Sequence, residues 1–226
     1  MVNSYKAALL AALGLAGAVT GQAATYTGDL LIGFTTQSGS DTIVDLGAAS
    51  SLTSGESWDL SSLLGSYDLS TVNWGVIGDK NVSGTGRLAW STYSLSGPLA
   101  SASAWGQLDT ATKSIYSNFG TAGAGQSISI LATDDNSWNQ QTINGALPTQ
   151  YHNVWGNPNN VGLGSEILYQ MLANGSDPVA LGSFALGANG SVSFTAVPEP
   201  TSYSILGGAG LLLASLRRPL RRKVSS

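Results

Sequence analysis

The chain has 226 residues, with 9 Lys or Arg, 13 Asp or Glu, one His and no Cys, and its formal net charge is −4. These counts exclude a disulfide framework, a Cys nucleophile, a Cys-ligated metal site and any site that needs two imidazoles from one chain. Gly accounts for 29 of the residues, nearly twice the usual ~7%, which favours turns and short strands over long helices.

Residues 1–23 predict a secretory signal peptide. Lys6 gives the segment a positive start, residues 7–19 are apolar, and small residues precede a cleavage point between Ala23 and Ala24. A helix over 7–19 spans only about 20 Å, which is short of the ~30 Å hydrocarbon core. The alternative is a buried N-terminal helix, but the run lacks the polar face that such a helix presents. We therefore expect export through the Sec translocon.

Residues 24–197 predict one strand-rich domain. Two segments, 179–186 and 191–197, flank a Gly-Ala-Asn-Gly turn and predict a closing hairpin. We expect a mainly β, antiparallel, sandwich-like domain with one or two short helices. The apolar positions that alternate with a period of two are Leu30/Ile32/Phe34, Val44/Leu46, Trp74/Val76, Leu88/Trp90, Ile128/Ile130 and Val192/Phe194/Ala196.

Helical signals are fewer than strand signals in this domain. Residues 165–174 begin at a capping Ser165, present three apolar residues on one face and end before Gly. Residues 109–119 are similar, with Asp109 as the expected cap. A short turn is expected over 57–64.

The domain contains no recognisable catalytic motif. His152 lies in an Asn-rich loop, and no Gly-x-Ser-x-Gly elbow accompanies it, so we expect a surface or hydrogen-bonded His. Asp134-Asp135-Asn136 offers oxygen ligands of the kind that Ca²⁺ prefers, but it lacks EF-hand spacing and also suits an ordinary turn. Paired carboxylates for glycoside hydrolysis remain open, because twelve acids lie in the domain. We expect no catalytic residue, no metal and no cofactor.

Six Trp residues raise the question of sugar binding, because aromatic faces stack on sugar rings. Trp138 and Trp155 lie in polar, Asn-rich surroundings, so we expect them to be the most exposed of the six. A glycan-contacting pair at these two positions is one hypothesis, and ordinary packing in the core or at its rim is the alternative.

The C-terminal residues 198–226 have three ordered parts. Pro198, Glu199 and Pro200 form a stiff, extended strip. Residues 203–216 are apolar or small and carry no charge, and a basic end over 217–223 follows. A helix over 203–216 spans about 21 Å and is a marginal membrane span. The basic end is expected to stay in the cytoplasm. The alternatives are a packed C-terminal helix or a surface helix, but no polar face interrupts the segment.

The order and terminal position of these parts resemble the PEP-CTERM sorting signal of exported bacterial proteins. The resemblance covers about the last thirty residues, and the segments 28–34 and 44–47 are also similar to the start of many proteins with this tail. It implies processing by an exosortase, a membrane transpeptidase-like enzyme, in a Gram-negative-type envelope. It further implies association with extracellular polysaccharide or biofilm matrix. The residues it assigns are Pro198, Glu199 and Pro200 as the recognition motif, and Arg217 and Arg218 as the stop-transfer signal.

The sequence therefore predicts an exported structural protein of the cell surface or extracellular matrix, anchored transiently in the inner membrane through 203–216, and not an enzyme. Residues 24–197 hold twelve of the thirteen acids and three of the nine bases, a net charge of −9. This charge disfavours nucleic acid as a partner, because phosphate binding needs clustered Lys and Arg. The alternatives are a secreted polysaccharide-binding module and, third, a secreted hydrolase with an unmarked carboxylate site.

Overall fold

The structure is a computed structural model, and it describes residues 28–81, 87–93, 102–119, 123–143, 159–172 and 177–197. The expected signal segment 1–23 and the expected sorting segment 198–226 lie outside these ranges. The two flanking helices expected there, an N-terminal signal helix and a C-terminal membrane helix, therefore stay predictions.

The described residues form one antiparallel sheet whose strand order is β3-β10-β9-β8-β5-β4-β1-β2-β6, with β7 paired to β4. The helices are a 3₁₀ turn at Ala49–Ser51, α1 at Ser61–Leu64, α2 at Ala102–Tyr116 and α3 at Trp138–Thr142. The strands are β1 (Asp29–Thr35), β2 (Ser40–Ala48), β3 (Ser57–Asp59), β4 (Asn73–Asn81), β5 (Arg87–Tyr93), β6 (Ser127–Leu131), β7 (Asn160–Val161), β8 (Gly164–Leu172), β9 (Val179–Leu186) and β10 (Ser191–Ala196).

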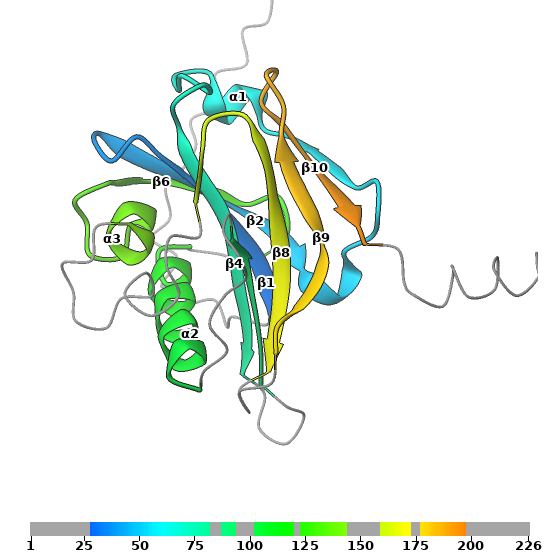
Figure 1. Cartoon of the computed structure of the whole chain (residues 1–226). Coiled ribbons are helices and arrows are strands. Elements are labelled where there is room, and N and C mark those ends of the chain that lie inside the picture. Colours follow the sequence, from blue (N-terminus) through cyan, green and yellow to red (C-terminus); the bar gives the residue numbers. More distant parts are fainter. Residues whose placement is uncertain are drawn as a thin grey trace, which may run out of the picture.

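The sheet curls into a half-barrel, and α2 and α3 lie together on one side of it (Figure 1). A mainly β, antiparallel fold with few short helices is thus confirmed. The expectation of a sandwich is wrong in one respect, because a single curled sheet takes the place of two stacked sheets. Alternation along a strand predicts which residues share a face, but it does not determine which strands pair.

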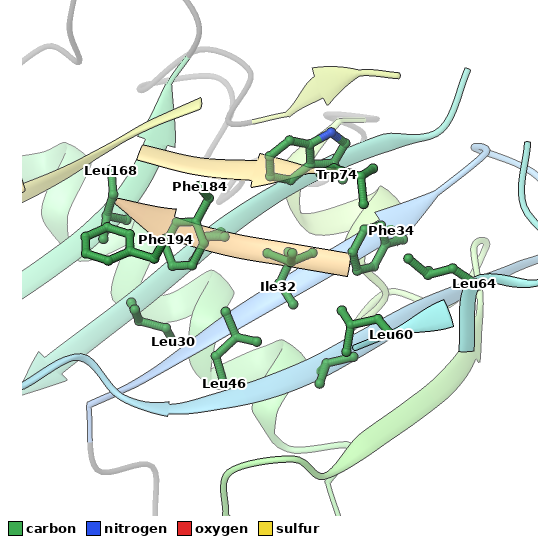
Figure 2. Packing of buried hydrophobic residues seen from close by; sticks show 14 of the residues in the cluster. Leu30, Ile32, Phe34, Leu46, Leu60, Leu64, Trp74, Leu168, Phe184 and Phe194 are labelled. Atoms are coloured by element: carbon green, nitrogen blue, oxygen red, sulfur yellow. The ribbon is translucent and has the colours of Figure 1, made fainter. Parts of the chain in front are cut away.

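The face toward which the sheet curls, called the inner face, holds the larger apolar core. Its ring pairs include Phe184 and Phe194, whose centroids lie 5.0 Å apart. The indole N–H of Trp74 donates to the carbonyl oxygen of Gly162 at 2.8 Å. Figure 2 shows how side chains from distant strands meet here, including Leu30, Ile32, Phe34, Leu46, Leu60, Leu64, Leu168 and the residues just named.

The opposite or outer face is covered by the two longer helices. Helix α2 packs on β4 and β5, and α3 packs on β1 and β2. Gly33 in β1 allows the ring of Trp138 in α3 to pack directly on the strand backbone, since a Cβ at position 33 would lie 1.9 Å from Cδ2 of Trp138. The apolar residues buried here are Leu31, Ile43, Ile77, Ala89, Leu108, Ala111, Ile115, Tyr116, Phe119, Trp138 and Met171.

The closing hairpin is confirmed as β9 and β10. Phe194 pairs with Phe184 across it, and Gly190 takes the positive φ of +79° that its turn requires. The alternating segments expected at 30–34, 44–46, 74–76, 88–90, 128–130 and 192–196 all fall in strands.

The helix expected over 165–174 is wrong, because these residues lie mostly in β8. Leu168 packs in the inner core and Met171 in the outer core, so their spacing of three reflects a strand buried on both sides. The helix expected over 109–119 is right in type but begins earlier, at residue 102. Asp109 is therefore not its cap and instead pairs with Lys113, one turn later, at 2.5 Å. Residues 57–64 form β3 and α1 in place of a simple turn.

Candidate functional site

The described surface contains a groove of about 470 Å³ between the β1–β2 turn, α1 and β6. Nine of its eleven lining residues carry a hydroxyl, and none is charged. The inner face changes character here, since Phe34 and Val44 are buried in the core whereas the residues that continue the same face line the groove. Those hydroxyl residues include Thr36, Ser38, Ser40, Thr42 and Ser129.

Tyr67 forms the one aromatic part of the groove wall. Its hydroxyl donates to the carbonyl oxygen of Ser40 at 2.8 Å and lies 3.0 Å from the hydroxyl of Thr42. Burial raises the pKa of Tyr67, so its phenol stays neutral at physiological pH. The groove therefore offers fixed, uncharged hydrogen-bonding groups beside an aromatic ring.

Sequence reasoning did not identify this groove. The available signal was a second alternation, in which Thr36, Ser38, Ser40 and Thr42 recur with a period of two. Hydroxyl residues at this spacing share one face of a strand and its turn. The sequence alone could not show that α1 and β6 face the same surface.

Several carboxyl groups are buried on the outer face, and Asp41 is the first of them. One of its oxygens accepts the backbone N–H of Asn139 at 2.7 Å, while the hydroxyl of Ser137 accepts the backbone N–H of Gln140 at 3.1 Å. Together the two side chains satisfy amides of the first turn of α3. Burial raises the pKa of Asp41, although hydrogen bonds from Thr35, Asn139 and Ser137 oppose the shift.

Asp45 holds two backbone segments together. Its carboxylate accepts the N–H of Gly47 at 2.8 Å and the N–H of Gly123 at 3.2 Å. Nearby, the hydroxyl of Tyr116 in α2 donates to Asp29 at 3.3 Å. Asp45 thus attaches β2 to the segment that precedes β6, and Asp29 attaches β1 to α2, which is a structural task for each carboxyl group.

Asp79 lies in β4 beneath α2, and its pKa is raised to about 9. Burial is the main cause, and the neighbouring Asp109 carboxyl adds to it through a hydrogen bond and charge repulsion. Lys113 opposes the shift and also pairs with Asp109. Asp79 is therefore protonated at neutral pH.

Glu166 is the corresponding acid on the inner face. It pairs with Phe184 across the β8–β9 ladder and shares the face of Leu168 by alternation. Burial raises its pKa to about 7. Its Oε2 atom has no hydrogen-bond partner within the described part of the chain.

These acids do not make a hydrolytic site among the described residues. Asp41, Asp45 and Asp79 are fully buried, so a substrate could not reach them. The groove itself has no carboxylate in its lining. A glycosidase needs two carboxyl groups about 5–10 Å apart that face the same sugar.

The expectation that Trp138 is exposed is wrong. Its side chain is 0% exposed, its ring packs on Gly33, and its N–H donates to Asn159 at 2.6 Å. The polar neighbours that suggested exposure are themselves buried: the amides of Asn139 and Gln140 donate to the carbonyl oxygen of Ala132. A buried ring offers no face to a sugar, so Trp138 is not a glycan contact.

The other predicted site residues lie outside the described ranges: Ala23 and Ala24, His152, Trp155, Pro198, Glu199 and Pro200, and Arg217 and Arg218. Asp134 and Asp135 are exposed in a turn, where Asp134 accepts the N–H of Asn136 at 2.9 Å. In the ranges that the structure describes, no group of three His, Asp or Glu side chains is placed to hold a metal ion.

Across the same ranges, every helix is too short or too polar to cross a membrane. Comparison with protein-family models, with curated proteins and with solved structures finds no match for this chain.

Proposed function

We propose that the chain is an exported structural protein of the cell surface or extracellular matrix, sorted by an exosortase through its C-terminal signal. The observation that carries the proposal is the ordered tail: Pro198, Glu199 and Pro200, then an uncharged apolar segment, then a basic end. The signal peptide expected at 1–23 agrees with the same orientation, with residues 24–197 outside the membrane.

The position of the sorting motif relative to the fold supports this proposal. Strand β10 ends at Ala196, and the side chain of Val197 is already 51% exposed. Pro198 therefore follows the last strand after one residue. A Pro-rich strip stays extended and cannot continue the ladder, so an enzyme at the outer membrane face can bind it.

In this account each terminal segment has one task. The apolar segment 203–216 holds the precursor in the inner membrane, and Arg217 and Arg218 stop its transfer. The exosortase then acts near the Pro-Glu-Pro motif and releases the domain. The domain itself serves as a non-enzymatic β module, in line with an uncharged groove and with acids that bond to the backbone.

The test replaces Pro198, Glu199 and Pro200 by Ala together, in cells that produce the chain. We expect the variant to remain in the inner membrane as an unprocessed precursor, while the unaltered chain is released. Replacing Thr201 and Ser202 by Ala is the matched control, because it changes adjacent residues and leaves the motif intact. Equal release of the motif variant and the control would contradict the proposal.

A second candidate function is binding of a neutral polysaccharide, and the hydroxyl-lined groove favours it. Nine hydroxyl groups and no charge suit a ligand that is itself uncharged and rich in hydroxyls. Tyr67 adds an aromatic surface of the kind on which sugar rings pack.

Soluble dextran and a β-glucan serve as probes for this second candidate. The double variant Ser38→Ala with Ser40→Ala should weaken binding measurably, whereas Ser51→Ala, an exposed hydroxyl outside the groove, should not. Absence of binding to either polysaccharide, or equal binding by both variants, would remove this candidate. The hydrolase alternative gains no support from the described carboxyl groups, since the most central of them are buried.

A further inference from the structure

Strand β6 forms one edge of the sheet and pairs only with β2 within the described residues. Its side chains alternate between exposed and half-buried, and Leu131 is 62% exposed. No strand or helix of the described chain covers this edge. An uncovered strand edge presents unpaired N–H and C=O groups to solvent.

The pattern of backbone hydrogen bonds shows which groups point outward. At one end of the β2–β6 ladder, the N–H of Asp45 donates to Gln126, and at the other, the N–H of Ala132 donates to Gly39. Hydrogen-bonded positions alternate in an antiparallel ladder, so Ile128 and Ile130 direct their backbone groups toward β2. The backbone groups of the three remaining residues, Ser127, Ser129 and Leu131, therefore point away from the sheet, and of these the carbonyl of Leu131 already accepts the N–H of Asp134 at 2.9 Å.

The two edges of the sheet differ in their protection. Strand β3 at the other edge has only three residues, ends in the charged Asp59 and leads directly into α1. Short length and charge are common means of blocking association at an edge. Strand β6 has five residues and contains neither charge nor Pro. It is the edge that can accept another strand.

We propose that β6 pairs with β6 of a second copy of this chain, antiparallel and about a twofold axis through Ser129. The three outward-pointing residues are centred on Ser129, so the pairing places Ser129 opposite Ser129 and Ser127 opposite Leu131. The outward N–H groups of Ser129 and Leu131 then meet the outward carbonyl groups of Ser129 and Ser127 in the other copy. This inference does not rest on the proposed sorting function.

Strand β6 carries no charge that would repel its own copy, which suits a second copy as the occupant. Residues 123–126, before the strand, are Gly, Ala, Gly and Gln, whereas residues 132–135, after it, end in Asp134 and Asp135. Both flanking segments turn, since the N–H of Gln126 donates to Gly123 and the N–H of Asp134 donates to Leu131, so Asp134 and Asp135 lie beyond the residues that pair. Strand β6 itself contains no charge, so no like charges lie opposite each other within the paired strands, although residues 24–197 carry a net charge of −9.

The pairing is expected to be weak in dilute solution. An edge of five residues buries less than the roughly 1,200 Å² of a stable interface. We therefore expect a dissociation constant on the order of 10–1,000 μM. A protein concentrated at a surface or in a matrix would associate at such an affinity, and one sheet would then continue through two molecules.

The experiment measures the mass of the full chain in detergent by sedimentation equilibrium over a range of concentrations. The unaltered chain and Ser129→Thr should associate equally. Ser129→Lys and Ser129→Glu should each associate about tenfold more weakly, because two like charges then lie directly opposite each other. An equimolar mixture of the Lys and Glu variants should regain association. The tail is identical in all four chains, so tail-driven association would not distinguish them.

Hydrogen exchange provides a second readout at single residues. The amides of Ile128 and Ile130 should be protected at every concentration, whereas those of Ser127, Ser129 and Leu131 should become protected only at high concentration. The proposal is overturned if the unaltered chain is monomeric throughout, if the Lys or Glu variant associates like it, or if the mixture does not recover.

Discussion

The two faces of the sheet are buried by different means. The inner face closes on itself through the curl of the sheet, and large apolar side chains fill it (Figure 2). The outer face is covered by α2 and α3 (Figure 1), and several carboxyl groups are buried on this face. Asp41 and Asp45 bond to backbone amides there, whereas Asp79 pairs with another acid.

This difference indicates which changes each face tolerates. Apolar contact is nondirectional, so the inner core should depend mainly on the volume that fills it. Hydrogen bonds to buried carboxylates are directional and depend on ionisation. The outer face should therefore be more sensitive to pH and to the exact position of each group.

The largest expected effect is that of Gly33→Ala on the outer face. The new Cβ would lie 1.9 Å from the ring of Trp138, which is fully buried and has no room to move. We expect the free energy of unfolding to fall by about 3 kcal/mol, as measured by urea denaturation. Gly106→Ala in α2 is the control, because the new Cβ meets nothing within 4 Å. The free energy of unfolding of this variant should rise by up to about 1 kcal/mol. Equal stability of the two variants would show that α3 is not packed as described.

A smaller loss of stability is expected for Asp41→Ala, which removes the oxygen that accepts the backbone N–H of Asn139 in the first turn of α3. A buried hydrogen bond to a charged group contributes about 2 kcal/mol, so urea denaturation should show a loss of that size. Asp134→Ala removes a similar bond to Asn136 in an exposed turn and should cost about 0.5 kcal/mol. Matching losses would mean that the carboxylate does not stabilise the outer face specifically.

The pH dependence of stability should change in Asp79→Asn. The pKa of Asp79 is about 9 in the folded chain and 3.8 as its ordinary value. As the pH rises, the unfolded chain therefore loses this proton at a lower pH than the folded chain does. The free energy of unfolding consequently falls as pH rises from about 4 toward 9. Asn cannot ionise, and the variant should be at least about 1 kcal/mol more stable than the parent at pH 8, with a smaller difference at pH 5. An identical decline between pH 5 and 8 in both chains would contradict the shifted pKa.

The inner face offers a weaker form of the same test in Glu166→Gln. The pKa of Glu166 rises from 4.5 to about 7, so its contribution to stability declines between these pH values and is constant above them. The variant should show a flatter stability profile over that interval only. A change of slope above pH 7 would indicate that another group is responsible.

The strands were largely predictable from the sequence, whereas their pairing, apart from that of β9 with β10, was not. Alternation identified the inner residues of β1, β2, β4 and β10, because one side of each meets the apolar core. Strand β8 was taken for a helix, because Leu168 and Met171 lie on opposite, equally buried faces of one strand. The curl of the sheet depends on contacts between distant residues, such as Trp74 and Gly162, which no local pattern contains.

The candidate sites also divide into those that local sequence predicts and those that depend on tertiary structure. The proposed sorting motif is a local feature of the chain, so its prediction rests on residues 198–223 alone. The burial of Trp138 could not, because the polar residues around it turn inward to bond with backbone carbonyls. The groove also depends on tertiary structure, since Ser40 and Tyr67 meet there only after β2 and α1 are assembled.

The intact mass of the protein recovered from the cell surface or the medium tests the central claim most directly. The account predicts a single mature species that begins at or near Ala24 and ends near Pro198, Glu199 and Pro200, and that therefore lacks both positive ends of the precursor. A recovered species whose mass includes residues 203–223 would contradict it.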